Sequence, residues 1–402
     1  MLKKNNFFQK FPFQSKSFNN NLRKTRKVFE SLKIDLNNFE IPTMESYEKN
    51  YNLNFSQQTI KKFYKYKNII IIGMGGSILG TKSIYSFLKK KIKKKLFFFD
   101  NLDSNLHLEF KKIKNLKKSC FIIVSKSGNT IETIANLGII YPKVKEGKKI
   151  IFITEMKDSN LVSLANNFNA EVIEHKPFIG GRYSVMSEAS MFPAALMGLK
   201  INKFKNLNKL IKNKNFIDAL IKNVASIFTL NNKGIKNSVL LNYDSDLNDL
   251  GDWYQQLVGE SLGKDGKGIT PILSNGPKYH HSVLQLYLDG PKDKFFTFLN
   301  STTKSEKYKI SKNLSNKNIK FLKNKNLNFI KAAQLNAVKS IFKIKKIPFR
   351  QITFNKKNEE ELGNTFTFFV LETILLSRLM NTNPFNQPAV EQVKIKTKNY
   401  LS

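Results

Sequence analysis

The sequence predicts an α/β protein built from two doubly wound parallel sheets, with helical segments at both ends of the chain. Short apolar runs of strand length alternate with longer segments of helical pattern, which is typical of buried parallel strands joined by helices. This alternation stops near residue 205 and then begins again. The chain has 402 residues, of which 41% are hydrophobic, so it is long enough for two packed domains.

The first group of predicted strands begins at Asn68. Its members are Asn68–Gly73, Lys95–Asp100, Cys120–Ser125, Lys149–Thr154 and Ala170–Glu174. Candidate strands of the second group are Ser238–Asn242, Lys294–Asn300 and Pro348–Phe354. Its long helix candidates are Leu247–Leu262, Asn326–Phe342 and Glu359–Met380. The Lys- and Asn-rich stretch 301–325 is predicted to be a solvated face or a loop.

These elements divide the chain into four parts. Residues 1–50 are polar with scattered Phe and Leu, which predicts a helical or irregular lead-in. We expect the first α/β domain at 51–204 and the second at 205–382. Residues 383–402 are predicted to form a helical tail, because prolines set a turn before a helix that runs from Glu391 to the end.

The charge balance is strongly basic, with 68 Lys and Arg against 30 Asp and Glu and a formal net charge of +38. Such a balance favours an RNA-binding protein. Only five of the basic residues are arginines, however, and the lysines are spread along the whole chain. Arg reads phosphates and bases better than Lys, so a specific nucleic-acid surface should contain more of it. We therefore expect no specific nucleic-acid partner.

The remaining composition points to the cytoplasm. Cys120 is the only cysteine, which excludes an internal disulfide framework and suits a reducing compartment. No apolar stretch approaches the roughly 18 residues of a membrane span. The first ten residues lack the apolar core of a signal peptide. We expect a cytoplasmic protein that does not contact a membrane.

Two loops rich in glycine and hydroxyl groups follow the first and third predicted strands. They read Gly73-Met74-Gly75-Gly76-Ser77 and Ser125-Lys126-Ser127-Gly128-Asn129-Thr130-Ile131-Glu132-Thr133. Glycines between a strand and a helix let backbone N–H groups approach an anion at the helix N-terminus. Because the carboxyl ends of parallel strands meet at one edge of a sheet, the sequence predicts a phosphate cradle there.

Two other interpretations of these loops stay open. Ser and Thr at the start of a helix are also ordinary N-caps. A nicotinamide-dependent dehydrogenase would bind its dinucleotide at such a loop, and Asp100 stands about where a ribose-binding acid is expected. The third glycine of that fingerprint would fall at Ile78, however, and Ser77 follows the glycines directly.

An arginine and a glutamate are candidates for chemistry on the substrate. Arg182, in Gly180-Gly181-Arg182-Tyr183-Ser184, is the only arginine between Arg26 and Arg350. In a chain that otherwise uses lysine, this position is expected to need the planar guanidinium, although a surface arginine beside a glycine turn is the alternative. Gln256 and Glu260 are four apart on a predicted helix and share a face. Glu260 is a candidate general base, and an exposed helical glutamate is the alternative.

Two further segments complete the set of candidates. His280-His281-Ser282 contains half of the four histidines and precedes another predicted helix. No spaced set of Cys, His and carboxylates accompanies it, so no metal site is predicted. The C-terminal segment reads Asn383-Pro384-Phe385-Asn386-Gln387-Pro388-Ala389-Val390-Glu391-Gln392-Val393-Lys394, in which nothing in the sequence alone selects Lys394.

Taken in order, these motifs resemble the phosphoglucose isomerase family of the shorter bacterial type, from about Asn68 to the end. The two hydroxyl loops resemble the sugar isomerase (SIS) fold, a flavodoxin-like sandwich. The later motifs that carry the resemblance are Gly-Gly-Arg-Tyr-Ser, Gly-Glu-Ser-Leu-Gly-Lys, His-Ser-Val-Leu-Gln and Asn-Pro-Phe-Asn-Gln-Pro-Ala-Val-Glu. The family pattern is not followed by Pro277-Lys278-Tyr279 before the histidines or by Gln392-Val393 before Lys394. The choice between His280 and His281 therefore stays open.

The resemblance implies reversible isomerisation of glucose 6-phosphate and fructose 6-phosphate through an enediol, in glycolysis and gluconeogenesis, without metal or cofactor. The implied catalytic residues are Glu260 as the base, Arg182 near the reacting carbons, and His281 and Lys394 for ring opening. The implied substrate-binding residues are Gly76, Ser77, Ser125, Lys126, Ser127, Thr130, Thr133, Gln256 and Gln387. A homodimer is implied, in which His281 completes the neighbouring site. The alternatives are a non-catalytic sugar-phosphate sensor and a bifunctional phosphoglucose/phosphomannose isomerase.

Overall fold

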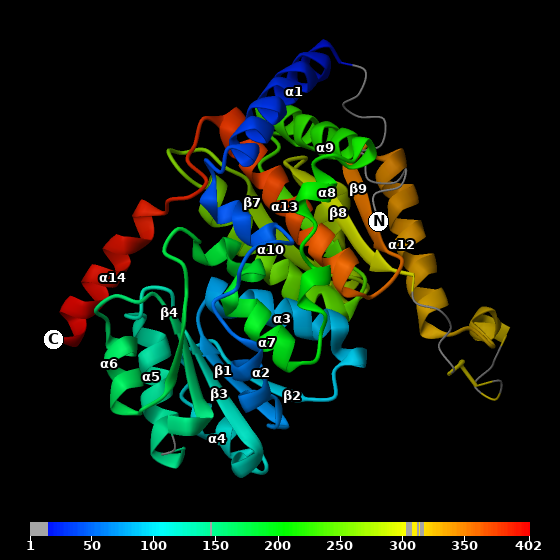
Figure 1. Ribbon diagram of the computed structural model, residues 1–402. Coiled ribbons are helices and arrows are strands. Elements are labelled where there is room, and N and C mark those ends of the chain that lie inside the picture. The colour runs from blue at the N-terminus through cyan, green and yellow to red at the C-terminus, as the bar shows by residue number, and fades with distance from the viewer. Residues whose placement is uncertain (1–14, 145–146, 303–307, 312, 314–316) are drawn as a thin grey trace.

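Two parallel sheets form the framework of the computed structural model, which describes residues 15–144, 147–302, 308–311, 313 and 317–402 (Figure 1). The first sheet has the order β2-β1-β3-β4-β5, with strands Asn68–Gly73 (β1), Lys95–Phe99 (β2), Ser119–Val124 (β3), Ile150–Thr154 (β4) and Glu171–Glu174 (β5). The second has the order β7-β6-β8-β9, with strands Asn237–Asn242 (β6), Thr270–Asn275 (β7), Lys294–Ser301 (β8) and Phe349–Phe354 (β9). All neighbouring strands are parallel, which confirms the predicted fold class.

The helices cover both faces of each sheet. Those in the first half of the chain are Lys16–Asn37 (α1), Gln57–Tyr64 (α2), Gly76–Leu88 (α3), Leu106–Lys111 (α4), Ile131–Ile140 (α5), Asn160–Asn167 (α6) and Glu188–Leu196 (α7). Those in the second half are Leu207–Leu210 (α8), Lys214–Asn232 (α9), Asn248–Leu262 (α10), Leu284–Asp289 (α11), Leu327–Ile344 (α12), Glu359–Met380 (α13) and Pro388–Leu401 (α14). The three long helices predicted in the second half are confirmed as α10, α12 and α13.

The hydrophobic core lies in three layers that follow from strand alternation. Ile69 and Ile71 of β1 point into a large central cluster, while Ile70 and Ile72 point into a second cluster on the opposite face. The central cluster also contains Leu240 of β6, so it joins the two sheets through α3, α10 and α13. A third cluster covers the outer face of the second sheet. Helices α3 and α10 therefore pack against each other between the sheets (Figure 1).

Sequence reasoning missed one strand, β7. It reads Thr-Pro-Ile-Leu-Ser-Asn and lies at the edge of the second sheet. An edge strand needs less apolar surface than a central one and tolerates proline. Because β7 contains Pro271 and has polar residues at both ends, its sequence does not show the apolar run by which the other strands were predicted. The predicted final helix begins at Pro388, before the expected Glu391, because proline is favoured in the first turn.

The predicted lead-in 1–50 and the predicted loop 301–325 both contain helical structure. Within the predicted lead-in, α1 packs on α9 and α13, and its N-cap Ser15 accepts a hydrogen bond from the Phe18 amide (Figure 1). Residues 1–14 lie outside the described part of the chain. So do several residues of the predicted loop 301–325, whose described part includes a short 3₁₀ helix at Lys317–Leu322.

A buried ion pair joins β9 to α13 in the second half. Arg350 donates to both carboxylate oxygens of Glu372, and its Nε donates to Thr297 Oγ1 at 2.9 Å. Both charged side chains are at least 98% buried. Removing one partner would therefore leave an uncompensated charge in the core.

We predict that Glu372→Ala lowers the free energy of unfolding by about 3–5 kcal/mol, because the Arg350 charge stays buried without its partner. Asp289→Ala removes the exposed partner of Lys345 and should cost less than about 1 kcal/mol. Urea unfolding of both variants measures the difference. Equal losses would contradict the proposed importance of the buried pair.

Candidate active site

The two hydroxyl loops lie side by side at the carboxyl edge of the first sheet. Gly73 at the end of β1 is paired in register with Val124 at the end of β3. Gly75 is the N-cap of α3 and has a φ of +51°, a conformation that glycine adopts without strain. The first turn of α3, with Gly76 and Ser77, therefore begins beside Ser125.

The hydroxyls in these loops do not serve as ordinary helix caps. Thr130 is the N-cap of α5, yet its side chain makes no capping hydrogen bond. Its Oγ1 instead lies 2.8 Å from Ser125 Oγ, which is almost fully buried. Thr133 Oγ1, one turn into α5, is buried without a hydrogen-bond partner. Because a buried hydroxyl normally has a partner, the Thr133 hydroxyl is available to a ligand.

Ser127 and Lys126 complete the second loop. Ser127 is exposed, and its hydroxyl accepts a hydrogen bond from the Asn129 amide at 3.3 Å. Lys126 Nζ lies 3.6 Å from Glu155 Oε1, and burial lowers the pKa of Lys126. Sequence reasoning missed Glu155, which directly follows β4 at the same edge of the sheet. Its position after a predicted strand could have identified Glu155 as a site residue, because ligands bind at this edge of the sheet in parallel α/β folds.

The Arg182 turn packs directly against the start of α3. A Cβ atom on Gly76 would overlap the carbonyl group of Gly181. The hydroxyl of Ser184 stabilises this contact between the two backbones, because it lies 3.0 Å from the Gly76 carbonyl oxygen and 2.7 Å from the Gly181 carbonyl oxygen. The two glycine motifs predicted from sequence are therefore in contact, which places Arg182 next to the first hydroxyl loop.

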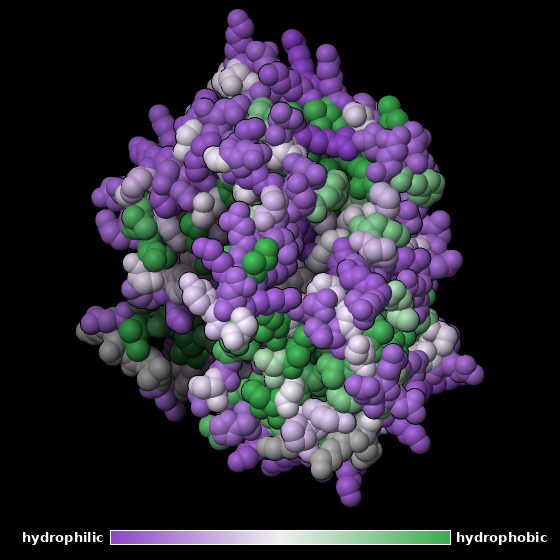
Figure 2. All heavy atoms as spheres, turned by 90° about the vertical axis from the view of Figure 1, so that its left-hand side faces the viewer, coloured by the Kyte–Doolittle hydropathy of each residue, from purple (hydrophilic) through white to green (hydrophobic). Residues whose placement is uncertain are grey.

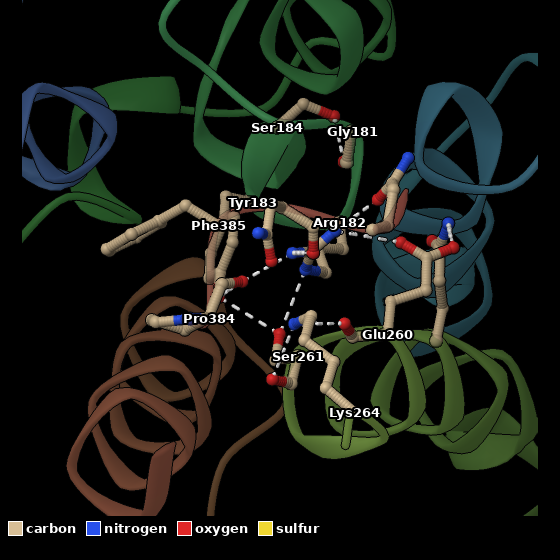
Figure 3. A network of polar contacts seen from close by, with 12 residues as sticks. Gly181, Arg182, Tyr183, Ser184, Glu260, Ser261, Lys264, Pro384 and Phe385 are labelled. Carbon is tan, nitrogen blue, oxygen red and sulfur yellow. Dashed lines mark hydrogen bonds and ion pairs between the residues drawn. The ribbon is translucent and has the colours of Figure 1, made fainter. Parts of the chain in front are cut away.

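Arg182 lies at the centre of the polar network (Figure 3). Its guanidinium is 1% exposed and has five N–H donors. The acceptors are Ser261 Oγ at 2.9 Å, Glu260 Oε2 at 3.1 Å, Gln387 Oε1, the Pro384 carbonyl and the Asn386 carbonyl. Every donor therefore has an acceptor, and the acceptors come from α10 and from the segment that precedes α14.

Glu260 is held by two donors on opposite sides. Its Oε2 accepts from Arg182, and its Oε1 accepts from Gln256 Nε2 at 3.0 Å. That amide nitrogen lies 2.8 Å from the position a Cβ would take on Gly75, so Gln256 links the base to the first loop. The carboxylate is 29% exposed and remains within reach of a ligand.

Sequence reasoning also missed Tyr183, Ser261 and Lys264. Tyr183 is buried, and its hydroxyl lies 3.0 Å from Ser261 Oγ and donates to the Pro384 carbonyl at 2.9 Å. Lys264 donates to two carbonyl groups at the end of α10 and to the Asn383 carbonyl between α13 and α14. Each of the three lies inside a motif already identified, but nothing in the sequence separates them from their neighbours.

Lys394 lies on α14, across a cavity of about 580 Å³ from the second hydroxyl loop. Ser127 and Thr130 line one side of this cavity, and Val390 and Lys394 line the other. Lys394 Nζ pairs with Glu391 Oε1 at 2.5 Å, and both side chains are exposed. In Figure 1 α14 extends from the second sheet toward α5 and α6. Figure 2 shows this face of the molecule, where hydrophilic side chains predominate.

The two histidines stand apart from the Arg182 network. They lie in a short 3₁₀ helix, Lys278–His281, that follows β7. His280 Nε2 is 2.6 Å from the hydroxyl of Tyr243, and burial lowers the pKa of His280. His281 is exposed. In the described part of the chain, the hydrogen bonds of Arg182 and Glu260 include neither histidine.

Two features are absent from the described residues. No group of three or more His, Cys, Asp or Glu residues there is placed to hold a metal ion. None of the helices in those ranges is long and apolar enough to cross a membrane. The single cysteine, Cys120, is buried on β3.

The fold and the site together define an α/β protein of the sugar isomerase type, with two hydroxyl-rich loops beside a paired carboxylate and guanidinium. Comparison with known sequences then gives the particular family. The family model for phosphoglucose isomerase matches residues 46–278. A glucose-6-phosphate isomerase of Methanocaldococcus jannaschii is 33% identical, over 83% of this chain and 84% of that protein. The chain belongs to the phosphoglucose isomerase family.

Solved structures agree on the fold. A hypothetical protein from Thermus thermophilus superposes with a TM-score of 0.84 at 20% identity, covering 98% of each chain. A glucose-6-phosphate isomerase from Chlamydia trachomatis superposes with a TM-score of 0.73 at 18% identity, covering 89% of this chain and 78% of that one. These likenesses show that the arrangement of two parallel sheets is shared.

We predict that Gly76→Ala lowers the free energy of unfolding by about 1–3 kcal/mol, because the added methyl group would push α3 away from the Arg182 turn. Gly138→Ala is the matched control, since a Cβ at Gly138 in α5 meets nothing within 4 Å. That control should stabilise the protein by up to about 1 kcal/mol. Urea unfolding measures both changes, and a Gly76→Ala protein as stable as the control would show that the close approach is unimportant.

Proposed function

We propose that this chain interconverts glucose 6-phosphate and fructose 6-phosphate by moving a proton between carbons 1 and 2 of the open-chain sugar. The observation that carries the proposal is the contact between Glu260 Oε2 and Arg182 at 3.1 Å, beside the hydroxyl loops. A carboxylate for proton transfer and a fixed cation for the developing charge are the two groups that the reaction needs. Family membership supports the same reaction.

The phosphate group is proposed to bind in the cradle formed by the two hydroxyl loops. Ser77, Ser125, Thr130 and Thr133 supply hydroxyls, and Gly76 supplies its backbone N–H at the start of α3. The Ser77 amide already donates to the Met74 carbonyl at 3.1 Å. The unpartnered hydroxyl of Thr133 supports this assignment. Neutral hydroxyls and amides suit a phosphate monoester that must bind and then leave. Lys126, held at 3.6 Å from Glu155, contributes a positive charge at the same edge.

Glu260 is proposed to be the base. Each carboxylate oxygen can accept more than one hydrogen bond, so the contacts with Gln256 and Arg182 leave lone pairs for the substrate proton. The same two contacts fix the orientation of the carboxylate. The base therefore takes a proton from carbon 2 and returns it to carbon 1 without changing its position.

Arg182 is proposed to stabilise the enediolate. All five of its N–H donors already have acceptors, and one of these acceptors is the carboxylate of Glu260. When Glu260 takes the substrate proton it becomes neutral, and its attraction for the guanidinium weakens. At that moment negative charge develops on the substrate oxygen. The positive charge of Arg182 is then available to the enediolate without any large movement, because the other acceptors keep the guanidinium in place.

His281 and Lys394 are proposed to assist ring opening, and Gln387 to contact the sugar. The hydrogen bond between His280 and Tyr243 supports the choice of His281, because it occupies the other histidine. The exposed position of His281, outside the Arg182 network, supports a homodimer in which each His281 completes the neighbouring site. A cytoplasmic location and a role in glycolysis and gluconeogenesis are part of the same proposal.

We predict that Glu260→Gln reduces isomerisation by about 10²-fold or more while fructose 6-phosphate still binds, because the amide keeps the shape and loses the base. A coupled assay measures the rate, and proton NMR in deuterated water measures exchange at carbon 2. Asp252→Asn, two turns earlier on the same helix, is the control and should retain activity. Exchange that persists in Glu260→Gln would place the base elsewhere.

We predict that two inactive variants, Glu260→Gln and His281→Ala, recover activity when they are co-expressed and mixed dimers form. In a mixed dimer one site carries both changes and the other carries neither, so about a quarter of full activity is expected. Glu260→Gln mixed with Arg182→Ala is the control, because both residues lie in one subunit and every site stays defective. Absence of recovery in the first mixture would contradict the dimer and the role of His281.

A further inference from the structure

Lys264 completes the C-terminal end of α10. The helix ends at Leu262, and its last carbonyl groups need partners outside the helix. Lys264 Nζ donates to the carbonyls of Glu260 and Ser261, both at 2.8 Å, while the Lys264 backbone amide donates to the Leu262 carbonyl at 2.9 Å. Lys264 therefore provides hydrogen-bond donors for three carbonyl groups of the last turn. This turn contains Glu260, the proposed base.

The third donor of the same ammonium group leaves the helix. Lys264 Nζ donates to the Asn383 carbonyl at 2.6 Å, in the segment 383–387 that joins α13 to α14. Arg182 and Tyr183 hold the Pro384 carbonyl of this segment, and Arg182 also contacts Gln387. Figure 3 shows Lys264 below the Arg182 network, next to Ser261. The ammonium thus joins the backbone of the base directly to the segment that carries Gln387.

We propose that Lys264 is a positioning residue that fixes the distance between the Glu260 turn and the segment 383–387. This inference rests on the proposed function, because it assumes that Glu260 and Gln387 act on one substrate. Lys264 itself touches no reacting atom in this scheme. It acts on Glu260 by holding the backbone of its helical turn, and on Gln387 by holding the start of its segment.

The electrostatic surroundings of the Lys264 amine are partly unfavourable for its positive charge. Burial and the neighbouring Arg182 lower the pKa of Lys264 to about 8, while Glu260 and Asp265 act in the opposite direction. A second cation beside Arg182 is unfavourable. The three carbonyl acceptors at a helix C-terminus, where the helix dipole attracts positive charge, offset this cost.

Lys267 provides a matched control on the same surface. It lies three residues further along the chain and is exposed, and its Nζ reaches the Asn381 carbonyl at 3.4 Å. Lys267→Met therefore removes the same charge from the same neighbourhood without touching the Glu260 turn. Lys264→Arg keeps donors at the original position, and Lys264→Met removes them while preserving the apolar stem.

The test combines steady-state kinetics on fructose 6-phosphate with hydrogen exchange of the intact proteins. Lys264→Met should lower kcat about 10-fold or more, because a small misplacement of a catalytic group is costly, while KM changes much less. Amide exchange in 383–387 should become faster, with the protein still folded at the assay temperature. Lys264→Arg should recover part of the lost kcat, and Lys267→Met should match the wild type in both measurements.

Three results would overturn the inference. Lys264→Met could retain the wild-type kcat and exchange, or it could lose activity only in proportion to its unfolded fraction. Alternatively, Lys267→Met could lower kcat and speed exchange as much as Lys264→Met, which would show that the loss of charge, and not of the Lys264 hydrogen bonds, is responsible. A wild-type protein without isomerase activity would instead contradict the proposed function, and hydrogen exchange in 383–387 would still decide whether Lys264 holds the segment.

Discussion

The guanidinium of Arg182 is buried, and a buried cation requires an acceptor for each of its N–H groups. No single element of the fold offers five acceptors in one plane. Helix α10 supplies two side chains, and the segment 383–387 supplies two backbone carbonyls and one amide oxygen. These separate parts of the chain must therefore meet at one point. A lysine could not hold them together, because its three donors diverge from one nitrogen.

The second constraint is the direct contact between two backbones. The start of α3 and the Arg182 turn approach each other so closely that only glycine fits at position 76. This contact connects the anion cradle of the first sheet to the guanidinium, and Gln256 connects the cradle to Glu260 from the other side. In the proposed reaction, phosphate binding and proton transfer therefore share one framework, through which the phosphate would orient the reacting carbons.

The carboxyl edge of the second sheet has a different chemistry. After β6, Asp244 and Asp246 both pair with Lys357, and Ser301 at the end of β8 donates to Asp244. Carboxylates here occupy the place that hydroxyls occupy in the first sheet. Lys357 balances only one of the two negative charges, so this edge would repel a phosphate. The similar topology of the two sheets therefore does not create two equivalent sites.

The amino-acid sequence by itself determined the two sheets, the two hydroxyl loops and the order of the site motifs, because strand periodicity and glycine turns are local properties. It also distinguished Arg182, as a rare arginine in a lysine-rich chain. Only the tertiary structure decided which acceptors bind Arg182, since the Pro384 carbonyl lies 202 residues away and a carbonyl has no sequence signature. The same applies to Glu155 beside Lys126, to the Tyr243 contact that occupies His280, and to Lys264. Each depends on packing between distant elements, where the chain folds back on itself, rather than on the spacing of residues along it.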